Sequence, residues 1–84
     1  MEETIIVGRI RSFLNRQFPL TQNIGDEQSL LGGGLIDSLG VLEVVSFLET
    51  EFNIAVADED LLPENFGSLR NLAQFVTGKQ NVSN

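Results

Sequence analysis

Asp37 and Ser38 are the residues of this sequence whose types and order are best suited to chemistry. They stand just after a glycine run, Gly32-Gly33-Gly34, and at the start of an amphipathic stretch. Aspartate is a good helix N-cap, because its carboxylate accepts a hydrogen bond from a first-turn N–H that otherwise has no partner. Ser38 then falls at the first helical position, beside the positive end of the helix dipole. A phosphate on its hydroxyl would lie where helix N-termini favour anions.

Ser38 is not equipped to act as a catalytic nucleophile. An activated serine needs a base within hydrogen-bond reach. The sequence has no histidine, its one lysine is the distant Lys79, and Asp37 is occupied as a cap. No other constellation supports catalysis, so the sequence predicts a protein that is not an enzyme.

Two other kinds of site fit this sequence poorly. A phosphate-binding glycine loop needs a preceding strand and a Gly-Lys-Ser/Thr ending, and the glycine run has neither. The acidic segment Asp58-Glu59-Asp60 lacks the central glycine and terminal glutamate of a calcium-binding EF-hand loop. There is also no cysteine for a thiolate site, so we expect no metal.

The segment around Ser38 resembles the modification site of acyl carrier and peptidyl carrier proteins. Their motif, Asp-Ser-Leu at the start of the second helix, is matched by Asp37-Ser38-Leu39. The likeness extends over nearly the whole chain, through Glu43, Phe47-Leu48-Glu49-Thr50-Glu51-Phe52, Val56-Ala57-Asp58 and the last helix. The resemblance implies an all-α four-helix bundle with three long helices and one short third helix.

The resemblance also implies a cargo and partners. A phosphopantetheinyl transferase would move a 4′-phosphopantetheine arm from coenzyme A to Ser38, and the arm's thiol would hold an acyl or aminoacyl group as a thioester. A loading ligase and downstream synthase or transferase enzymes are the other expected partners. The residues expected to contact these partners are Asp37, Leu39 and Glu43 on the second helix and Leu62 and Phe66 on the third.

The second helix departs from the pattern of fatty-acid carriers. Gly40 stands where an acid is typical, as it also does in D-alanyl carriers, Ser46 replaces a methionine and Thr50 replaces an acid. We therefore expect a free-standing carrier of a specialised pathway. A fatty-acid or D-alanyl carrier is the alternative within this class. A non-carrier helical interaction module, in which Asp37-Ser38 is only a cap, is the alternative from another class.

Phe47 suggests what the cargo is. It stands where fatty-acid carriers usually have an alanine, and its ring could fill the space that holds a long acyl chain. Our hypothesis is a cargo that is short or is an amino acid. Ordinary packing of the Phe47 ring is an equal alternative.

Hydrophobic periodicity predicts the helices that position this site. The first covers residues 2–17 and ends before Pro19, with Ile6, Ile10, Phe13 and Leu14 as its buried stripe. The second covers residues 37–52. Its core residues are predicted to be Val41, Val44, Val45, Leu48 and Phe52, and its exposed residues Leu39, Glu43, Ser46 and Thr50.

The predictions for the two connections and the fourth helix depend on single residues. Leu30 and Leu31 should pin the long connection 18–36 to the core. Residues 53–67 should hold a short helix with Asp58-Glu59-Asp60 at its N-terminus, Pro63 limiting it, and Val56, Leu61, Leu62 and Phe66 as anchors. The fourth helix, 68–77, should be capped by Ser68, bury Leu69, Leu72, Ala73 and Val76, and end at Gly78. One domain, 1–78, and a disordered tail, 79–84, are expected.

The charge distribution bears on the partners. The net charge is −7, and all ten charged residues between Arg16 and Arg70 are acidic. Such a surface repels nucleic acid and suits basic patches on partner proteins; an acidic face that only aids solubility is the alternative. No apolar run approaches the roughly 20 residues of a membrane span, and Glu2 and Glu3 contradict the cationic start of a signal peptide. We expect a cytoplasmic monomer that binds neither nucleic acid nor membrane.

Overall fold

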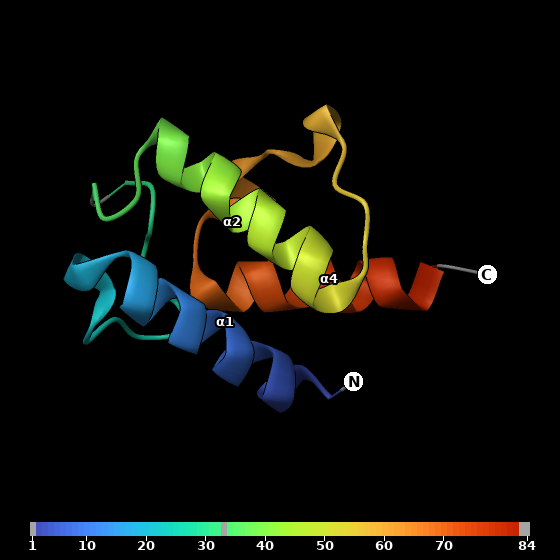
Figure 1. Cartoon of the computed structure of the whole chain (residues 1–84), viewed down its shortest axis with the longest axis horizontal. Coiled ribbons are helices and arrows are strands. Elements are labelled where there is room, and N and C mark those ends of the chain that lie inside the picture. The colour runs from blue at the N-terminus through green and yellow to red at the C-terminus, as the bar shows by residue number, and fades with distance from the viewer. Residues whose placement is uncertain (1, 33, 83–84) are drawn as a thin grey trace.

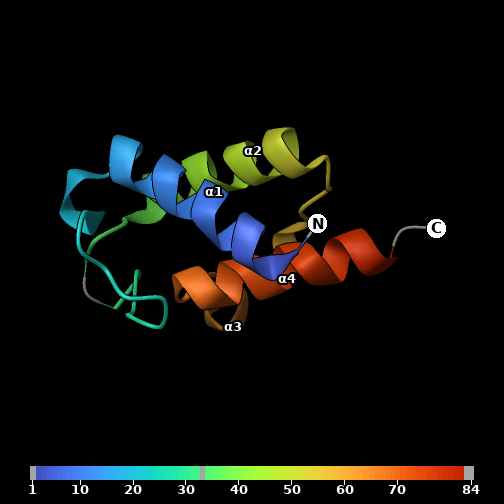
Figure 2. The same ribbon diagram turned by 90° about the horizontal axis from the view of Figure 1, so that it is seen from below.

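The computed structural model describes residues 2–32 and 34–82, and the regular elements within these ranges are all helical. Three long helices and one short third helix are present, together with two 3-10 turns. In chain order they are α1 (Glu3–Gln17), η1 (Pro19–Thr21), α2 (Ser38–Phe52), η2 (Asp58–Asp60), α3 (Pro63–Phe66) and α4 (Leu69–Val82). Figures 1 and 2 show α1 and α2 lying against α4, with α3 beside the start of α4. The predicted all-α four-helix bundle is confirmed.

Each long helix buries one stripe of apolar side chains, because residues three and four apart share a helix face. The stripes meet in one core. They consist of Ile6, Ile10 and Leu14 from α1, Val44, Leu48 and Phe52 from α2, and Leu69, Leu72, Ala73 and Val76 from α4. These core predictions are confirmed. Phe13, Val41 and Val45, predicted as core, are only partly buried at its edge.

The predicted starts and ends of the helices hold at two places and fail at a third. α1 ends at Gln17, where Phe18 turns extended ahead of Pro19. The Ser68 hydroxyl accepts a hydrogen bond from the Asn71 N–H at 3.1 Å, as a cap of α4 should. The predicted end at Gly78 is wrong, since α4 continues to Val82.

One contact distant in sequence and one within α4 accompany the longer helix. Lys79 pairs with Asp60 at 2.9 Å and its Nζ lies 5.7 Å from the centre of the Phe75 ring. Residues 79–82 are therefore helical rather than a disordered tail; residues 83 and 84 lie outside the described residues.

Not all of the leucines predicted to anchor the two connections are buried. Leu30 is buried, but Leu31, Leu61 and Leu62 are exposed and are not core anchors. Asp58-Glu59-Asp60 forms its own 3-10 turn, and Pro63 opens α3 at its first position instead of ending it. The prediction that these acidic residues form the N-terminus of α3 is therefore wrong.

The connection between α1 and α2 is tied to the bundle in its first half. The Asp26 carboxylate pairs with Arg11 and lies 3.7 Å from Nη2 of Arg70. The Asp26 carbonyl accepts the Arg70 N–H at 2.8 Å, and the Gly67 carbonyl accepts the Leu30 N–H at 2.7 Å. These bonds hold the connection against α1 and the start of α4.

Over residues 2–32 and 34–82, no helix has the length and apolar character needed to cross a membrane.

Candidate functional site

Asp37 caps α2 as its sequence position predicted. Its backbone is extended, and its carboxylate accepts the Gly40 N–H at 2.7 Å. Its carbonyl accepts the Val41 N–H at 2.9 Å, which is the first bond of the helix. The cap fixes where α2 begins and so places Ser38 at the first helical position.

Ser38 is exposed at this helix end. Its hydroxyl has no hydrogen-bond partner among the described residues. The cap uses the Gly40 N–H, so the N–H groups of Ser38 and Leu39 stay available to an anion. The site therefore offers an accessible hydroxyl beside two backbone donors and the positive end of a helix dipole.

The glycine run serves the turn before the cap. Gly34 has φ of +74°, a left-handed conformation that favours glycine. Gly33 lies outside the described residues. The run thus contributes at Gly34 the backbone conformation that this turn requires.

Gly40 has a role at the site that the sequence analysis missed. It is buried, and a Cβ at this position would lie 2.7 Å from Cγ2 of Ile36 and 2.9 Å from Cε1 of Phe18. Only a glycine lets the first turn of α2 approach these two side chains so closely. A glycine in the first turn of an otherwise periodic helix was the one sequence signal for this close approach.

The predicted partner-contact residues fall into two groups. Leu39 is 72% exposed, Glu43 and Leu62 are also exposed, and Asp37 lies at the surface. Phe66, in contrast, is only 4% exposed and packs with its ring centre 5.5 Å from that of Phe75. The assignment of Phe66 as a surface contact is wrong, because this side chain belongs to the core.

Two exposed leucines beside the site were not predicted. Leu20, just after α1, is 72% exposed, and Leu42 projects from the first half of α2. Leu20 and Leu39 both line a hollow of about 460 Å³, which Asp37 and Glu43 also line. Ser38 stands between two of these residues in the chain, so it lies beside a small surface hollow lined by leucines and carboxylates.

No group of three or more metal-ligating side chains is arranged to hold an ion within the part of the chain that the structure describes.

A family model for the phosphopantetheine attachment site matches residues 5–76. The chain belongs to this family. It is a carrier domain whose prosthetic group is covalently bound 4′-phosphopantetheine, and carriers of this family are generally non-catalytic and work with partner enzymes. The comparison with curated proteins finds no match for the chain.

Proposed function

We propose that Ser38 is the residue that carries the 4′-phosphopantetheine arm. The single observation that supports this most strongly is the exposed Ser38 hydroxyl at the first position of α2, beside the Asp37 cap. A phosphodiester at this oxygen would accept hydrogen bonds from the free first-turn N–H groups and gain from the helix dipole. The residues present thus fit the group.

In this proposal the chain presents cargo and leaves the chemistry to its partners. When bound, the arm supplies a thiol that holds an acyl or aminoacyl group as a thioester. The chain's own residues keep Ser38 at the surface and offer Leu39 and Glu43 to partners. A phosphopantetheinyl transferase, a loading ligase and downstream synthase or transferase enzymes are the partners we propose. A flexible tether raises the effective concentration of cargo at each of their active sites.

The exposed face of α2 supports a specialised pathway. Its solvent side carries Leu39, Leu42, Glu43, Ser46, Thr50 and Glu51, so leucines and neutral residues outnumber acids. Partners that fit such a face would dock by apolar contact as well as by charge. This favours partner enzymes dedicated to one pathway over those of a fatty-acid carrier, which recognise acidic side chains. A D-alanyl carrier is the alternative in the same class, because D-alanyl carriers also have a glycine at the position of Gly40.

The position of Phe47 supports a short or aminoacyl cargo. Its ring stacks on Phe13 at 4.1 Å and meets Phe52 edge-on at 6.0 Å. The ring therefore occupies space between α1 and α2 that a smaller residue would leave open. A long acyl chain would have to displace this stack to enter there.

The attachment residue is tested by intact mass. The wild-type protein, incubated with coenzyme A and a broad-specificity transferase, should gain the mass of the arm. Ser38→Ala should keep the fold and gain nothing. Ser46→Ala is the matched control, since it removes an exposed hydroxyl from the same helix, and it should load like the wild type. Loading of Ser38→Ala would place the arm elsewhere, and no loading of the wild type would leave a helical interaction module.

A further inference from the structure

Three surface hollows follow one another along α1 and α2, and neighbouring hollows share lining residues; we call this row of hollows the α1–α2 seam. The first, beside Ser38, has about 460 Å³ and shares Glu43 with the second, of about 480 Å³. The second shares Arg16 and Phe47 with the third, of about 380 Å³. The seam therefore starts at the proposed attachment site and runs between the two helices.

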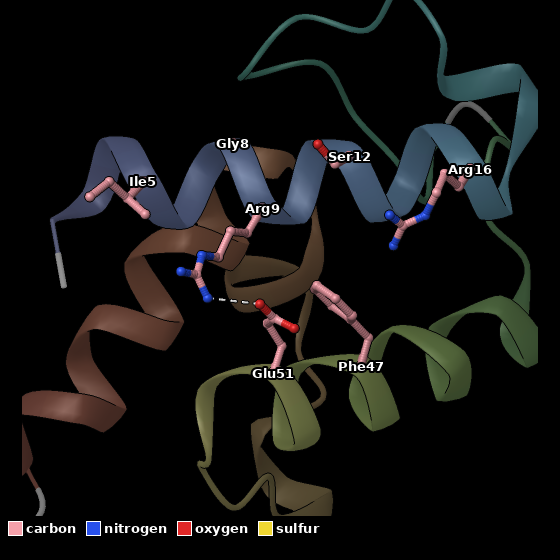
Figure 3. A pocket seen from close by; sticks show the side chains of 7 residues that line it. All are labelled: Ile5, Gly8, Arg9, Ser12, Arg16, Phe47 and Glu51. Carbon is pink, nitrogen blue, oxygen red and sulfur yellow. Dashed lines mark hydrogen bonds and ion pairs between the residues drawn. The ribbon is translucent and has the colours of Figure 1, made fainter.

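The far part of the seam is drawn in Figure 3. Arg9 and Arg16 point from α1 towards α2, and Phe47 points from α2 into the space between them. Arg9 closes this end through a 2.8 Å ion pair with Glu51. The hollow between Arg9 and Arg16 has a volume of about 380 Å³.

Aromatic rings follow the seam along most of its length. Phe18 meets Phe13 edge-on at 6.2 Å, Phe13 stacks on Phe47 at 4.1 Å, and Phe47 meets Phe52 at 6.0 Å. Phe18 lines the first hollow, Phe13 and Phe47 the second, and Phe47 the third. A ligand in the seam would therefore rest on an apolar, aromatic wall.

Arg16 is the cation of the seam whose charge is not neutralised. Within the described residues the other cationic side chains are paired with carboxylates: Arg9, Arg11, Arg70 and Lys79. Arg16 is exposed and has no such partner there. Its guanidinium can bind a carboxylate through two parallel hydrogen bonds.

We propose that the α1–α2 seam is a binding site for a short acyl group that ends in a carboxylate, carried on the arm attached to Ser38. The methylenes would lie against Phe13 and Phe47, and the carboxylate would pair with Arg16. This inference rests on the proposed function of Ser38 and adds the chemical class of the cargo.

The seam lies within reach of Ser38. Nine residues of α2 separate Ser38 from Phe47, which is about 14 Å along the helix axis. The arm has about thirteen bonds between phosphorus and sulfur, and at the extension of a polypeptide chain these span about 15 Å. A thiol at that distance brings a cargo of a few carbons alongside Phe47 and Arg16.

The proposal is tested by comparing two cargos of similar size and different charge. The ¹⁵N-labelled protein is loaded from glutaryl-coenzyme A or from valeryl-coenzyme A, and loading is verified by intact mass. In amide NMR spectra, the glutaryl form should shift residues 12–17 and 46–51 relative to the form that carries the arm alone. The valeryl form should shift them about two- to fivefold less, the effect expected of one exposed charge contact.

Three variants separate the charge of Arg16 from its surroundings. Arg16→Gln should reduce the glutaryl shifts to those of the valeryl form, and Arg16→Lys should retain part of the difference. Lys79→Gln removes the same charge from α4 and should leave the glutaryl shifts in the seam unchanged. Equal shifts for both cargos, or glutaryl shifts that survive in Arg16→Gln, would overturn the proposal. A protein that loads normally but shows no shifts in the seam refutes this inference alone, whereas a protein that does not load refutes the function of Ser38.

Discussion

The turns at Ser38 and at Asp60 are both fixed against helices, but close packing adds to the cap at the first, whereas polar contacts hold the second. At Ser38 the fixing contacts are the Asp37 cap and the close approach of Gly40 to Phe18 and Ile36. At Asp60 they are polar and ionic. The Asp60 carboxylate accepts the Ala57 N–H at 3.0 Å and pairs with Lys79 at 2.9 Å.

The difference bears on what each region tolerates. Close packing stabilises only atoms in contact, so salt weakens it little. Added atoms, however, overpack the contact and destabilise it. A partly exposed ion pair such as Lys79–Asp60 is screened by salt, whose Debye length is about 8 Å in the cell, and depends on the charge of both partners. The proposed attachment site should thus be sensitive to side-chain volume, and the Asp60 turn to pH.

Gly40→Ala should have the largest effect on stability. The added Cβ must displace Ile36 or the Phe18 ring, and overpacking of this kind typically costs about 1–3 kcal/mol. Alanine recovers up to about 1 kcal/mol of helix propensity, so we expect a net loss of about 1–2 kcal/mol. The shift in the urea midpoint at constant m measures it.

Gly78→Ala is the matched control for that substitution. Gly78 also lies inside a helix, but a Cβ there meets nothing within 4 Å. Alanine should therefore stabilise the protein by about 0.5–1 kcal/mol. If the two substitutions shifted the midpoint in the same direction, close packing at Gly40 would not be what distinguishes the two regions.

Asp37→Ala should have the next largest effect. It leaves the Gly40 N–H without its acceptor, and losing such a cap costs about 1 kcal/mol. Asp37→Ser keeps a capping oxygen and should recover most of the loss. Amide exchange of Gly40 and Val41, whose N–H groups bond to Asp37, should quicken in the alanine variant more than exchange in α4. Uniform quickening over the whole chain would show that the cap stabilises the bundle without specifically fixing the start of α2.

The parts of this structure that were predictable from sequence are those set by local signals. Apolar periodicity located α1, α2 and α4, and an aspartate before an amphipathic stretch located the cap and Ser38. The errors lie where distant contacts decide. Gly78 is typical of a helix end, but α4 continues past it, where Lys79 pairs with Asp60. Gly40 is required because Phe18, distant in sequence, packs closely against it.

Short segments were hardest to predict for a related reason. α3 has four residues, too few for periodicity to show which side faces the core. Leu62 and Phe66 were therefore treated alike, both as core anchors and as partner contacts, although the structure exposes the first and buries the second. The same lack of a repeat left Leu30 and Leu31 indistinguishable in the connection before α2.

The smallest effect is expected at Asp60, where the comparison concerns pH. The hydrogen bond from the Ala57 N–H, followed by the contact with Lys79, lowers the pKa of this carboxyl below its ordinary value. A lowered pKa means that the ionised form stabilises the fold. That contribution is complete above the unfolded pKa of about 3.9 and is lost as the pH falls through the folded value. Asp60→Asn should accordingly lower the melting temperature slightly at pH 7 and have a smaller effect near pH 2. Gly40→Ala should lower the melting temperature at both pH values, because the clash of a methyl group does not titrate. If the effect of Gly40→Ala vanished in acid, charge rather than side-chain volume would govern the Ser38 end as well.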